Sequence, residues 1–328
     1  MGGLLFNTKR ISKDEFMPYL DEVKELLYNE TDYQFFVPKW INDKEDFGDL
    51  DIVVKSPVDI ELLKEIFKPE RFKSNGPVFS LVYRDFQIDF IKHSPEDFDS
   101  SENYYCYNDL GNLIGRLAQR FALKFGPDGL RYVYYQDTKK LGEFNISKNM
   151  SSILSFLDLD VNKFYEGFET RKELFDFIIK SKYFNPYIYD MEHLNKINRD
   201  RNKKRTTYVA WLDYVDPLKK FFDKDGLFDG DKKIFIPAIN NHFFNNSEFF
   251  EWILEKDREA ELKSQIAEKF NGNIVMEITD LRAKKLGKFI QDFKNWVEET
   301  YSNDFNQYVL NSYDYQIKND IRNFNQIR

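Results

Sequence analysis

The chain contains a single cysteine, Cys106, among its 328 residues. One cysteine excludes an intrachain disulfide framework and is typical of a reducing compartment, where it packs as a small apolar side chain. No apolar run of about 18 residues is present, so we expect no membrane-spanning helix. The sequence also lacks a secretory signal pattern, and a cytoplasmic location is the resulting expectation.

Two further absences narrow the chemistry. The three histidines, His93, His193 and His242, are far apart and lack the spacing of zinc ligands. The phosphate-binding loop Gly-x-x-x-x-Gly-Lys-Ser/Thr is missing, which argues against an ordinary ATPase. A net charge of −8 argues against indiscriminate nucleic-acid binding but does not describe local patches. With 42% hydrophobic residues, the chain can bury two or three domain cores.

Three aspartates lie within apolar runs that favour strands. Asp49 and Asp51 belong to the segment 47–54, FGDLDIVV, and Asp89 belongs to the segment 86–91, FQIDFI. Residues i and i+2 of a strand point to the same face, so Asp49 and Asp51 are predicted to project together. If the two strands pair, all three carboxylates converge and require divalent cations to offset their repulsion. Mg²⁺ or Mn²⁺ is the expected cofactor, and phosphoryl or nucleotidyl transfer is the implied chemistry.

The pattern predicts an α+β fold that begins with a small α/β domain containing a mixed sheet. We expect this catalytic domain to span residues 1–98, with its elements in the order helix 12–28, strands 34–41 and 47–54, helix 59–67, and strands 78–83 and 87–91. Ser12 and Glu15 form a predicted capping box for the first helix. The last two strands form a predicted hairpin around Arg84 and Asp85.

The remainder of the chain is predicted to be mainly helical. We expect a central domain at residues 99–216 that lines the nucleotide cleft, and a C-terminal domain at residues 217–328. The predicted elements are helices 109–124, 170–180, 193–215, 247–270 and 280–299, a short strand 274–278, and either a closing helix or a partly ordered tail at the end.

Positive and polar residues recur on the predicted helices. Asn112, Arg116 and Arg120 form one stripe, which we interpret as cleft-facing because Gly111 and Gly115 allow a close neighbour; the alternative is an ordinary surface helix. The segment 126–129, GPDG, is predicted to stop this helix. Two basic clusters follow, at 199–205 and 282–288. Each is either a solvated helix face or a phosphate-binding surface.

The acidic pattern resembles that of the DNA polymerase beta-type nucleotidyltransferase superfamily. The segment 48–51, GDLD, and Asp89 match the acidic part of the motif, whereas the usual Gly-Ser pair is replaced by the segment 36–40, FVPKW. Lys39, Lys44 or the opening Gly2-Gly3 are then expected to hold the triphosphate.

A closer resemblance is to the poly(A) polymerase-like branch of bacteriophages and large DNA viruses, which implies the host cytoplasm as the location. It is carried by the segment 1–3 together with Phe6, Arg10 and Ile11, and by the segments 38–54, 107–116, 123–130 and 199–208. The segment 278–290 is also similar to helices near the C-terminus of tRNA nucleotidyltransferases.

The resemblance implies roles for individual residues. Asp49 and Asp51 would hold both metal ions, and Asp89 would hold the ion that activates the attacking 3′-hydroxyl. The nucleotide-binding residues would be Lys39, Gly48, Asn112, Arg116 and Lys124, and the RNA-binding residues would be Arg199, Arg201, Lys203, Lys204 and Arg205. Tyr104, Tyr105 and Tyr107 are expected either to stack on the base or to pack at a domain junction.

The expected activity is template-independent transfer of a nucleoside monophosphate from an NTP, with ATP first among the donors, to the 3′-hydroxyl of an acceptor, with RNA preferred. A cyclic-oligonucleotide synthase and an enzyme that nucleotidylates a protein or small molecule are alternatives of the same class. A non-catalytic nucleotide-binding or nucleic-acid-binding module is the alternative outside it. No membrane partner is expected, and the sequence leaves the oligomeric state open.

Overall fold

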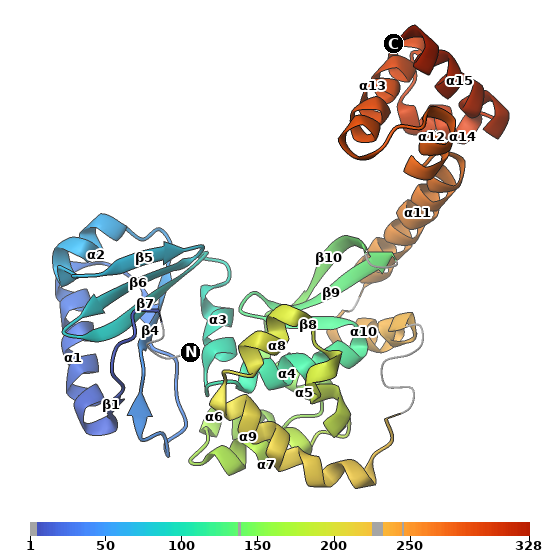
Figure 1. Cartoon of the computed structure of the whole chain (residues 1–328). Helices are drawn as coiled ribbons and strands as arrows, with labels where there is room; N and C mark the ends of the chain where they lie inside the picture. Colours follow the sequence, from blue (N-terminus) through green and yellow to red (C-terminus); the bar gives the residue numbers. More distant parts are fainter. Residues whose placement is uncertain (1–4, 137–138, 225–231, 245) are drawn as a thin grey trace. The chain divides into compact units, whose positions relative to one another are not determined.

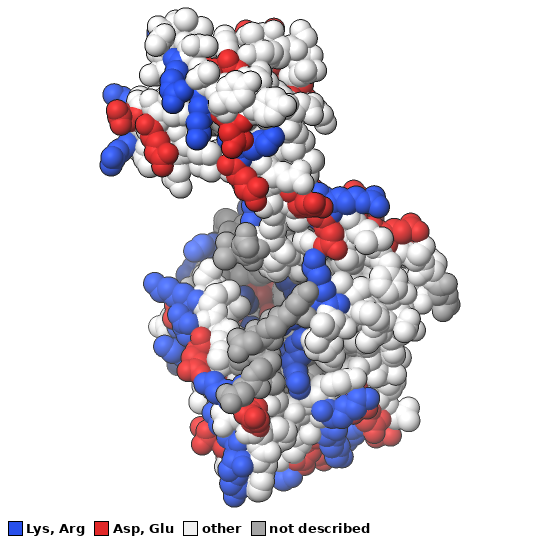
Figure 2. Space-filling model, turned by 90° about the vertical axis from the view of Figure 1, so that its right-hand side faces the viewer, with Lys and Arg blue, Asp and Glu red and all other residues white. Residues whose placement is uncertain are grey.

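The computed structural model describes residues 5–136, 139–224, 232–244 and 246–328. The chain divides into two compact units, one of residues 1–133 and 143–247 and the other of residues 134–142 and 248–328 (Figure 1). Within the described ranges, no helix is both long and apolar enough to cross a membrane. Lys and Arg side chains are interspersed with Asp and Glu on the face drawn in Figure 2.

The first unit begins with a five-stranded mixed sheet in the order β2-β4-β7-β6-β5. Its strands are β2 (Phe35–Phe36), β4 (Leu50–Lys55), β5 (Phe72–Asn75), β6 (Val78–Tyr83) and β7 (Phe86–His93). Strands β4 and β7 are parallel, and the other neighbours are antiparallel. A separate two-stranded ladder pairs β1 (Ile11–Ser12) with β3 (Asp46–Phe47). The predicted α+β class with a mixed sheet is confirmed.

Two helices, α1 (Lys13–Glu30) and α2 (Ile60–Phe67), pack on one face of this sheet. The predicted capping box is present, because the Ser12 hydroxyl accepts from the Glu15 amide while the Glu15 carboxylate accepts from the Ser12 amide. The core that results combines both helices with alternate strand residues: Phe16, Leu20, Val23, Leu27, Leu50, Ile52, Val54, Leu63, Phe67, Ile88 and Phe90. The intervening residues of β4 and β7 therefore face the opposite side of the sheet.

The β6–β7 hairpin also forms as predicted. Arg84 and Asp85 both have positive φ, 47° and 61°, and Tyr83 pairs with Phe86. A two-residue turn with this conformation matches the right-handed twist of the flanking strands and fixes their register. The predicted strand 34–41 is reduced to two residues, and the predicted strand 47–54 is interrupted at Gly48 and Asp49, between β3 and β4.

The rest of the first unit contains helices and part of a second sheet, whose residues 134–142 belong to the second unit. The helices are α3 (Phe98–Tyr105), α4 (Leu110–Ala118), α5 (Met150–Phe156), α6 (Val161–Glu166), α7 (Arg171–Ile179), α8 (Lys196–Asn202), α9 (Thr206–Val215) and α10 (Ile236–Phe243), with 3₁₀ turns η1 (Gln119–Phe121), η2 (Pro186–Tyr189), η3 (Met191–His193), η4 (Asp216–Phe221) and η5 (Lys232–Phe235). The second sheet has the order β10-β9-β8, with β8 (Leu123–Gly126), β9 (Gly129–Gln136) and β10 (Lys139–Ser147).

This second sheet corrects two expectations. The predicted helix 109–124 ends at Ala118, and Ala122 adopts a left-handed conformation, so Lys124 lies on β8 rather than on the helix. The segment 126–129 is expected to stop that helix. It instead forms the turn of the β8–β9 hairpin, in which Gly126 pairs with Gly129. The sequence pattern does not predict a strand here.

Helix α4 packs very closely against α3. A Cβ atom added to Gly111 would lie 2.3 Å from the Tyr104 carbonyl oxygen. This distance is far below van der Waals contact, so glycine is required at this position. The expectation that Gly111 allows a close neighbour is confirmed, and the neighbour is α3.

The second unit is a helical bundle. It contains α11 (Glu248–Lys269), α12 (Gly272–Thr279), α13 (Ala283–Tyr301), α14 (Phe305–Asn311) and α15 (Asp314–Ile327). The predicted strand 274–278 is wrong, because this segment lies in α12. The Asn271 side chain accepts from the amides of Asn273 and Ile274 and so begins a helix there. Two tyrosine hydroxyls, from Tyr301 and Tyr308, satisfy the buried carboxylate of Asp320.

Candidate active site

Asp49, Asp51 and Asp89 form a cluster at the β4–β7 pair. One carboxylate oxygen from each residue lies within 4.8 Å of the others. Asp51 and Asp89 are direct partners in the parallel register, whereas Asp49 lies just before β4 and follows Gly48. All three are on the face opposite α1 and α2. The predicted strand pairing therefore brings the three carboxylates together, as expected.

The cluster is electrostatically crowded. Burial, followed by the negative charges of Asp49 and Asp89, raises the pKa of Asp51 to about 8. The Asp51 side chain is nevertheless open to solvent on one side, so water screens part of this effect. Burial also raises the pKa of Asp89. Such shifts are expected where carboxylates share a site without a bound cation.

Two polar neighbours orient Asp89. The Gln87 side-chain amide donates to both carboxylate oxygens, at 2.9 and 3.0 Å, and Ser80, the cross-strand partner of Asp89, also hydrogen-bonds to it. Both hydrogen bonds favour the ionised form and oppose the effect of burial. Gln87 is 2% exposed, and its Oε1 atom has no hydrogen-bond partner in the part of the chain that the structure describes. Asp89 is therefore held in place independently of the other two carboxylates.

Cationic side chains lie beside the cluster. Lys44 interacts electrostatically with Asp49 and then Asp51, although burial is the larger effect and lowers its pKa. Its Nζ atom lies 4.1 Å from the centre of the Phe47 ring. Arg10 donates two hydrogen bonds to the Asp46 carboxylate, at 2.9 and 2.7 Å, and also interacts with the charge of Asp49.

The sequence predicted Lys44 only as one of the candidates for holding the triphosphate, and it assigned no role at the site to Arg10. The β1–β3 ladder places Arg10 here, since Ser12 pairs with Asp46. Two-residue strands leave almost no sequence signal, and this explains the omission. Gly2 and Gly3, the other option for holding the triphosphate, lie outside the described residues.

The last residue of α3, Tyr105, is linked to the cluster electrostatically. Tyr105 interacts with the charge of Asp51, and its hydroxyl lies 3.1 Å from Nε2 of His93, the last residue of β7. Tyr104 packs edge-on against Phe125, while Tyr107 is buried against Phe168. Of the three tyrosines considered for base stacking, Tyr105 is the one with an electrostatic link to the acidic cluster.

The donor set suits a hard divalent cation. All three ligands are carboxylate oxygens, which Mg²⁺ and Mn²⁺ accept and which soft metals bind less well. The spacing of the oxygens, within 4.8 Å, is compatible with sharing one or two ions. Asp49, Asp51 and Asp89 are therefore the residues that could hold a metal here.

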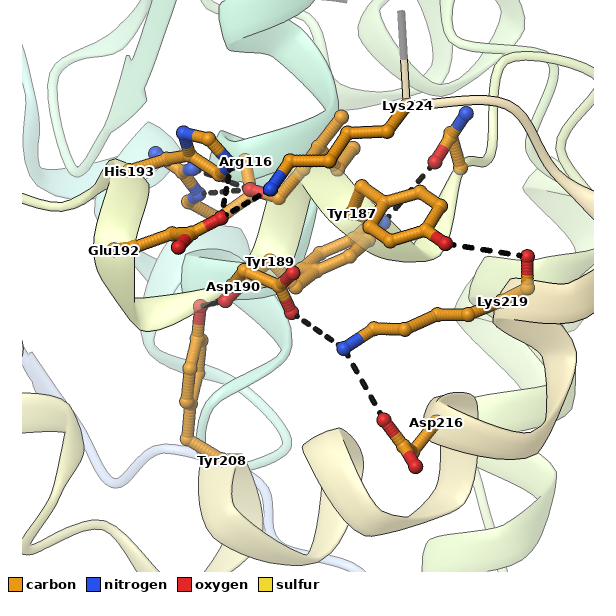
Figure 3. A network of polar contacts seen from close by, with 12 residues as sticks. Arg116, Tyr187, Tyr189, Asp190, Glu192, His193, Tyr208, Asp216, Lys219 and Lys224 are labelled. Carbon is orange, nitrogen blue, oxygen red and sulfur yellow. Dashed lines mark hydrogen bonds and ion pairs between the residues drawn. The ribbon is translucent and has the colours of Figure 1, made fainter.

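A second group with metal-ligand spacing comprises Asp190, Glu192 and His193. Figure 3 shows that its carboxylates already face lysines: Asp190 contacts Lys219 at 2.9 Å, and Glu192 contacts Lys224 at 2.5 Å. The positive charges of these lysines take the place that a cation would occupy. We interpret this group as an ion-pair network that stabilises the helical part of the first unit.

The remaining residues predicted to bind nucleotide are spread over several elements. Lys39 is exposed, and its carbonyl accepts from the Tyr107 amide. Asn112 donates to the Asn202 side chain at 3.2 Å. Lys124 is exposed and lies 3.8 Å from Glu143.

Arg116 is buried, and the environment of its guanidinium is drawn in Figure 3. The guanidinium donates to the Ile188 carbonyl and to the Gln119 side chain, and burial lowers the pKa of the group. These contacts are made with the chain itself, and they link α4 to η2.

The predicted RNA-binding cluster on and after α8 is divided between two environments. Arg199 donates to the Leu194 carbonyl at 2.6 Å, and Arg205 forms an ion pair with the largely buried Asp109 at 2.7 Å. Arg201, Lys203 and Lys204 are exposed. The cluster therefore presents three cations to solvent, while the other two hold the structure together.

Comparison with known proteins gives a partial likeness. No protein-family model matches the chain, and no curated protein matches it. A crystal structure of Leishmania infantum polymerase beta in a ternary P/T complex has a TM-score of 0.33 and 10% identity, with 39% of this chain and 60% of that chain covered. A ternary gap complex of the same polymerase has the same TM-score and identity, with 39% and 53% covered. The match thus spans less than two thirds of each polymerase chain.

Proposed function

We propose that this protein is a template-independent nucleotidyltransferase that transfers a nucleoside monophosphate from an NTP to the 3′-hydroxyl of an acceptor. ATP is the donor and an RNA 3′ end is the acceptor in this proposal. The observation that carries it is the convergence of Asp49, Asp51 and Asp89 beside Lys44 and Arg10. Acidic and basic groups next to each other can bind the metal ions and the phosphates of one substrate complex.

In the proposed reaction, the acceptor oxygen forms a bond to the α-phosphorus while the bond to the pyrophosphate oxygen breaks, and the hydroxyl proton is released. Asp49 and Asp51 would hold both metal ions, and Asp89, oriented by Gln87 and Ser80, would hold the ion nearest the attacking hydroxyl. Bound Mg²⁺ or Mn²⁺ would supply charge neutralisation and lower the pKa of that hydroxyl.

Lys44 is the strongest candidate for the role of the absent Gly-Ser pair. Its ammonium lies within the field of Asp49 and Asp51, and its lowered pKa reflects a partly desolvated position. A triphosphate bound through metal ions at those carboxylates would bring phosphate oxygens close to this ammonium. Arg10 is already paired with Asp46, so it would contribute charge rather than a free donor.

The other assignments, except that of Arg116, remain part of the proposal. Lys39, Gly48, Asn112 and Lys124 are proposed to contact nucleotide, whereas the buried guanidinium of Arg116, which donates to the Ile188 carbonyl, is not. We propose that residues 1–98 form the catalytic domain and that residues 99–216 form a helical domain that lines the nucleotide cleft. Residues 217–328 are proposed to form a C-terminal, mainly helical domain. We also propose that the protein belongs to the poly(A) polymerase-like branch of bacteriophages and large DNA viruses.

The direct test is incubation with each radiolabelled NTP and Mg²⁺, with and without RNA, followed by a denaturing gel and chromatography. We expect RNA-dependent elongation that is lost in Asp51→Asn and kept in Glu65→Gln, which removes an exposed carboxylate on α2 instead. Removal of a metal ligand should lower the rate by at least about 10²-fold, the effect of losing one preorganised electrostatic partner. Small phosphatase-resistant products without primer would favour a cyclic-oligonucleotide synthase, and no turnover with any acceptor would favour a binding module.

A second test concerns the RNA-binding cluster. Replacing Arg201, Lys203 and Lys204 together with Gln removes the exposed cations and keeps the Arg205–Asp109 ion pair. RNA affinity should fall, and the salt slope of binding should become shallower by about 0.7 for each phosphate that the variant no longer neutralises. NTP affinity should be unchanged. Unaltered RNA affinity would remove the cluster from the proposed acceptor surface.

A further inference from the structure

The second unit contains a basic groove that the proposed reaction does not use. It has a volume of about 550 Å³ and lies between the beginning of α13 and the end of α15. Its lining residues are Leu281, Lys284, Lys285, Lys288, Asn325 and Arg328. Four of these six side chains are cationic, and none is acidic.

The lysines of this groove are available to a ligand. Lys284, Lys285 and Lys288 are exposed, and their side chains take part in no ion pair or hydrogen bond with any described residue. Arg328 differs, because it contacts Asp292 at 2.9 Å and its guanidinium lies 5.6 Å from the centre of the Phe289 ring. The groove therefore combines one anchored cation with three lysines that have no anionic partner among the described residues.

The beginning of α13 adds to the positive potential. The side chain of the N-cap residue, Arg282, makes no capping hydrogen bond, and the first turn contains no acidic residue. A helix N-terminus carries about half a positive charge, so lysines in the first turn are electrostatically unfavourable there. A bound anion would offset the repulsion among these cations, and the partial positive charge of the helix N-terminus would stabilise it.

We propose that this groove binds the phosphate groups of a single-stranded nucleic acid, as a contact separate from the acidic cluster. Lys284 and Lys288 are one helical turn apart, or about 6 Å along the axis, so they present charge along a line. An open row of exposed lysines suits the repeated phosphates of a strand, because each lysine can contact a different phosphate. The same chemistry could also bind a small polyphosphate, and the experiment distinguishes the two.

The test is fluorescence anisotropy of the full-length protein with labelled single-stranded RNA longer than about 16 nucleotides, the upper site size of a common single-strand-binding fold. Binding is measured in EDTA without NTP, from about 50 mM to about 1 M salt. The groove variant combines Lys284→Gln, Lys285→Gln and Lys288→Gln. If these lysines neutralise three phosphates, the salt slope should become shallower by about 2 in the variant, and affinity at about 0.1 M salt should fall about 100-fold.

A matched control combines Arg258→Gln, Lys263→Gln and Lys318→Gln, which remove three cations of the same unit that do not line the groove. The control should bind RNA nearly as the unmodified protein does, and circular dichroism should show equal helicity for both variants. An equal fall in affinity in the two variants, or no fall in the groove variant, would overturn the proposal. Binding of inorganic tripolyphosphate at the groove as tightly as RNA would overturn the strand assignment.

This experiment does not depend on catalysis. It is carried out without metal ions or NTP, and the groove residues belong to the second unit whereas the acidic cluster belongs to the first. Failure of nucleotidyl transfer with retained groove binding would reject the proposed reaction alone. Retained transfer with unaltered binding in the groove variant would reject this inference alone.

Discussion

Removing one carboxylate from the acidic cluster should stabilise the metal-free protein in a pH-dependent way. Asp51→Asn eliminates the interactions of Asp51 with Asp49 and Asp89, whose ligand oxygens lie within 4.8 Å. At this separation each pair of unit charges repels by about 0.9 kcal/mol in water and about 3.5 kcal/mol at an effective dielectric constant of about 20. Because Asp51 is open to solvent, we expect a gain near the lower limit, about 2 kcal/mol.

The sign of the pH dependence follows from the pKa of Asp51, which is about 8 in the folded protein. An unfolded aspartate has a pKa of about 3.9, so between these values the folded state binds more protons and loses stability as pH rises. The advantage of Asp51→Asn should therefore be absent below about pH 4, grow as the pH rises above that value, and be complete by about pH 8.

Denaturant unfolding in EDTA at about pH 5, 7 and 9 measures this difference, with Glu65→Gln as the control for removal of a distant carboxylate. Added Mg²⁺ should then stabilise the unmodified protein more than Asp51→Asn, because the variant has one ligand fewer. An equal stability difference at pH 5 and pH 9, or equal stabilisation by Mg²⁺, would refute the electrostatic account of the cluster.

Three further substitutions test other parts of the structure. Gly111→Ala should destabilise the protein by about 1–3 kcal/mol in denaturant unfolding, because its Cβ would lie 2.3 Å from the Tyr104 carbonyl oxygen; stability equal to the unmodified protein would disprove this packing. Gly287→Ala, in the interior of α13 with no atom within 4 Å of the added Cβ, should instead stabilise the helix by up to about 1 kcal/mol, and a decrease in stability would contradict the open position. Lys44→Ala should weaken NTP binding in calorimetric titration by about 10- to 100-fold, whereas Lys73→Ala on β5 should have no effect; unchanged affinity in Lys44→Ala would show that this lysine does not contact phosphate.

The acidic cluster could be predicted from the sequence because it depends on strong, local patterns. The alternation of Leu50, Asp51 and Ile52 predicts a strand with one apolar face, and the turn at Arg84 and Asp85 fixes the register of the following strand. The pairing of β4 with β7 then brings both apolar faces to the same helices.

The parts that sequence reasoning missed depend on weaker or competing patterns. The segment 274–278 is a short apolar run, which periodicity alone cannot assign to a strand or a helix, and the cap formed by Asn271 decided the outcome. In the β8–β9 hairpin, Gly126 and Gly129 were interpreted as a helix stop rather than as partners across a turn. The engagement of Arg116 with the Ile188 carbonyl depends on residues 72 positions apart, and no local pattern encodes such a contact.

The parallel pairing of β4 with β7 also determines when the cluster can assemble during folding. Asp51 and Asp89 belong to strands separated along the chain by α2, β5 and β6, and β7 lies between β4 and β6. Closing such a non-local pair is slow compared with forming a helix or a hairpin. A chain emerging from the ribosome would present Asp49 and Asp51 well before Asp89, so a complete set of three carboxylates would first exist only when the central strand had entered the sheet.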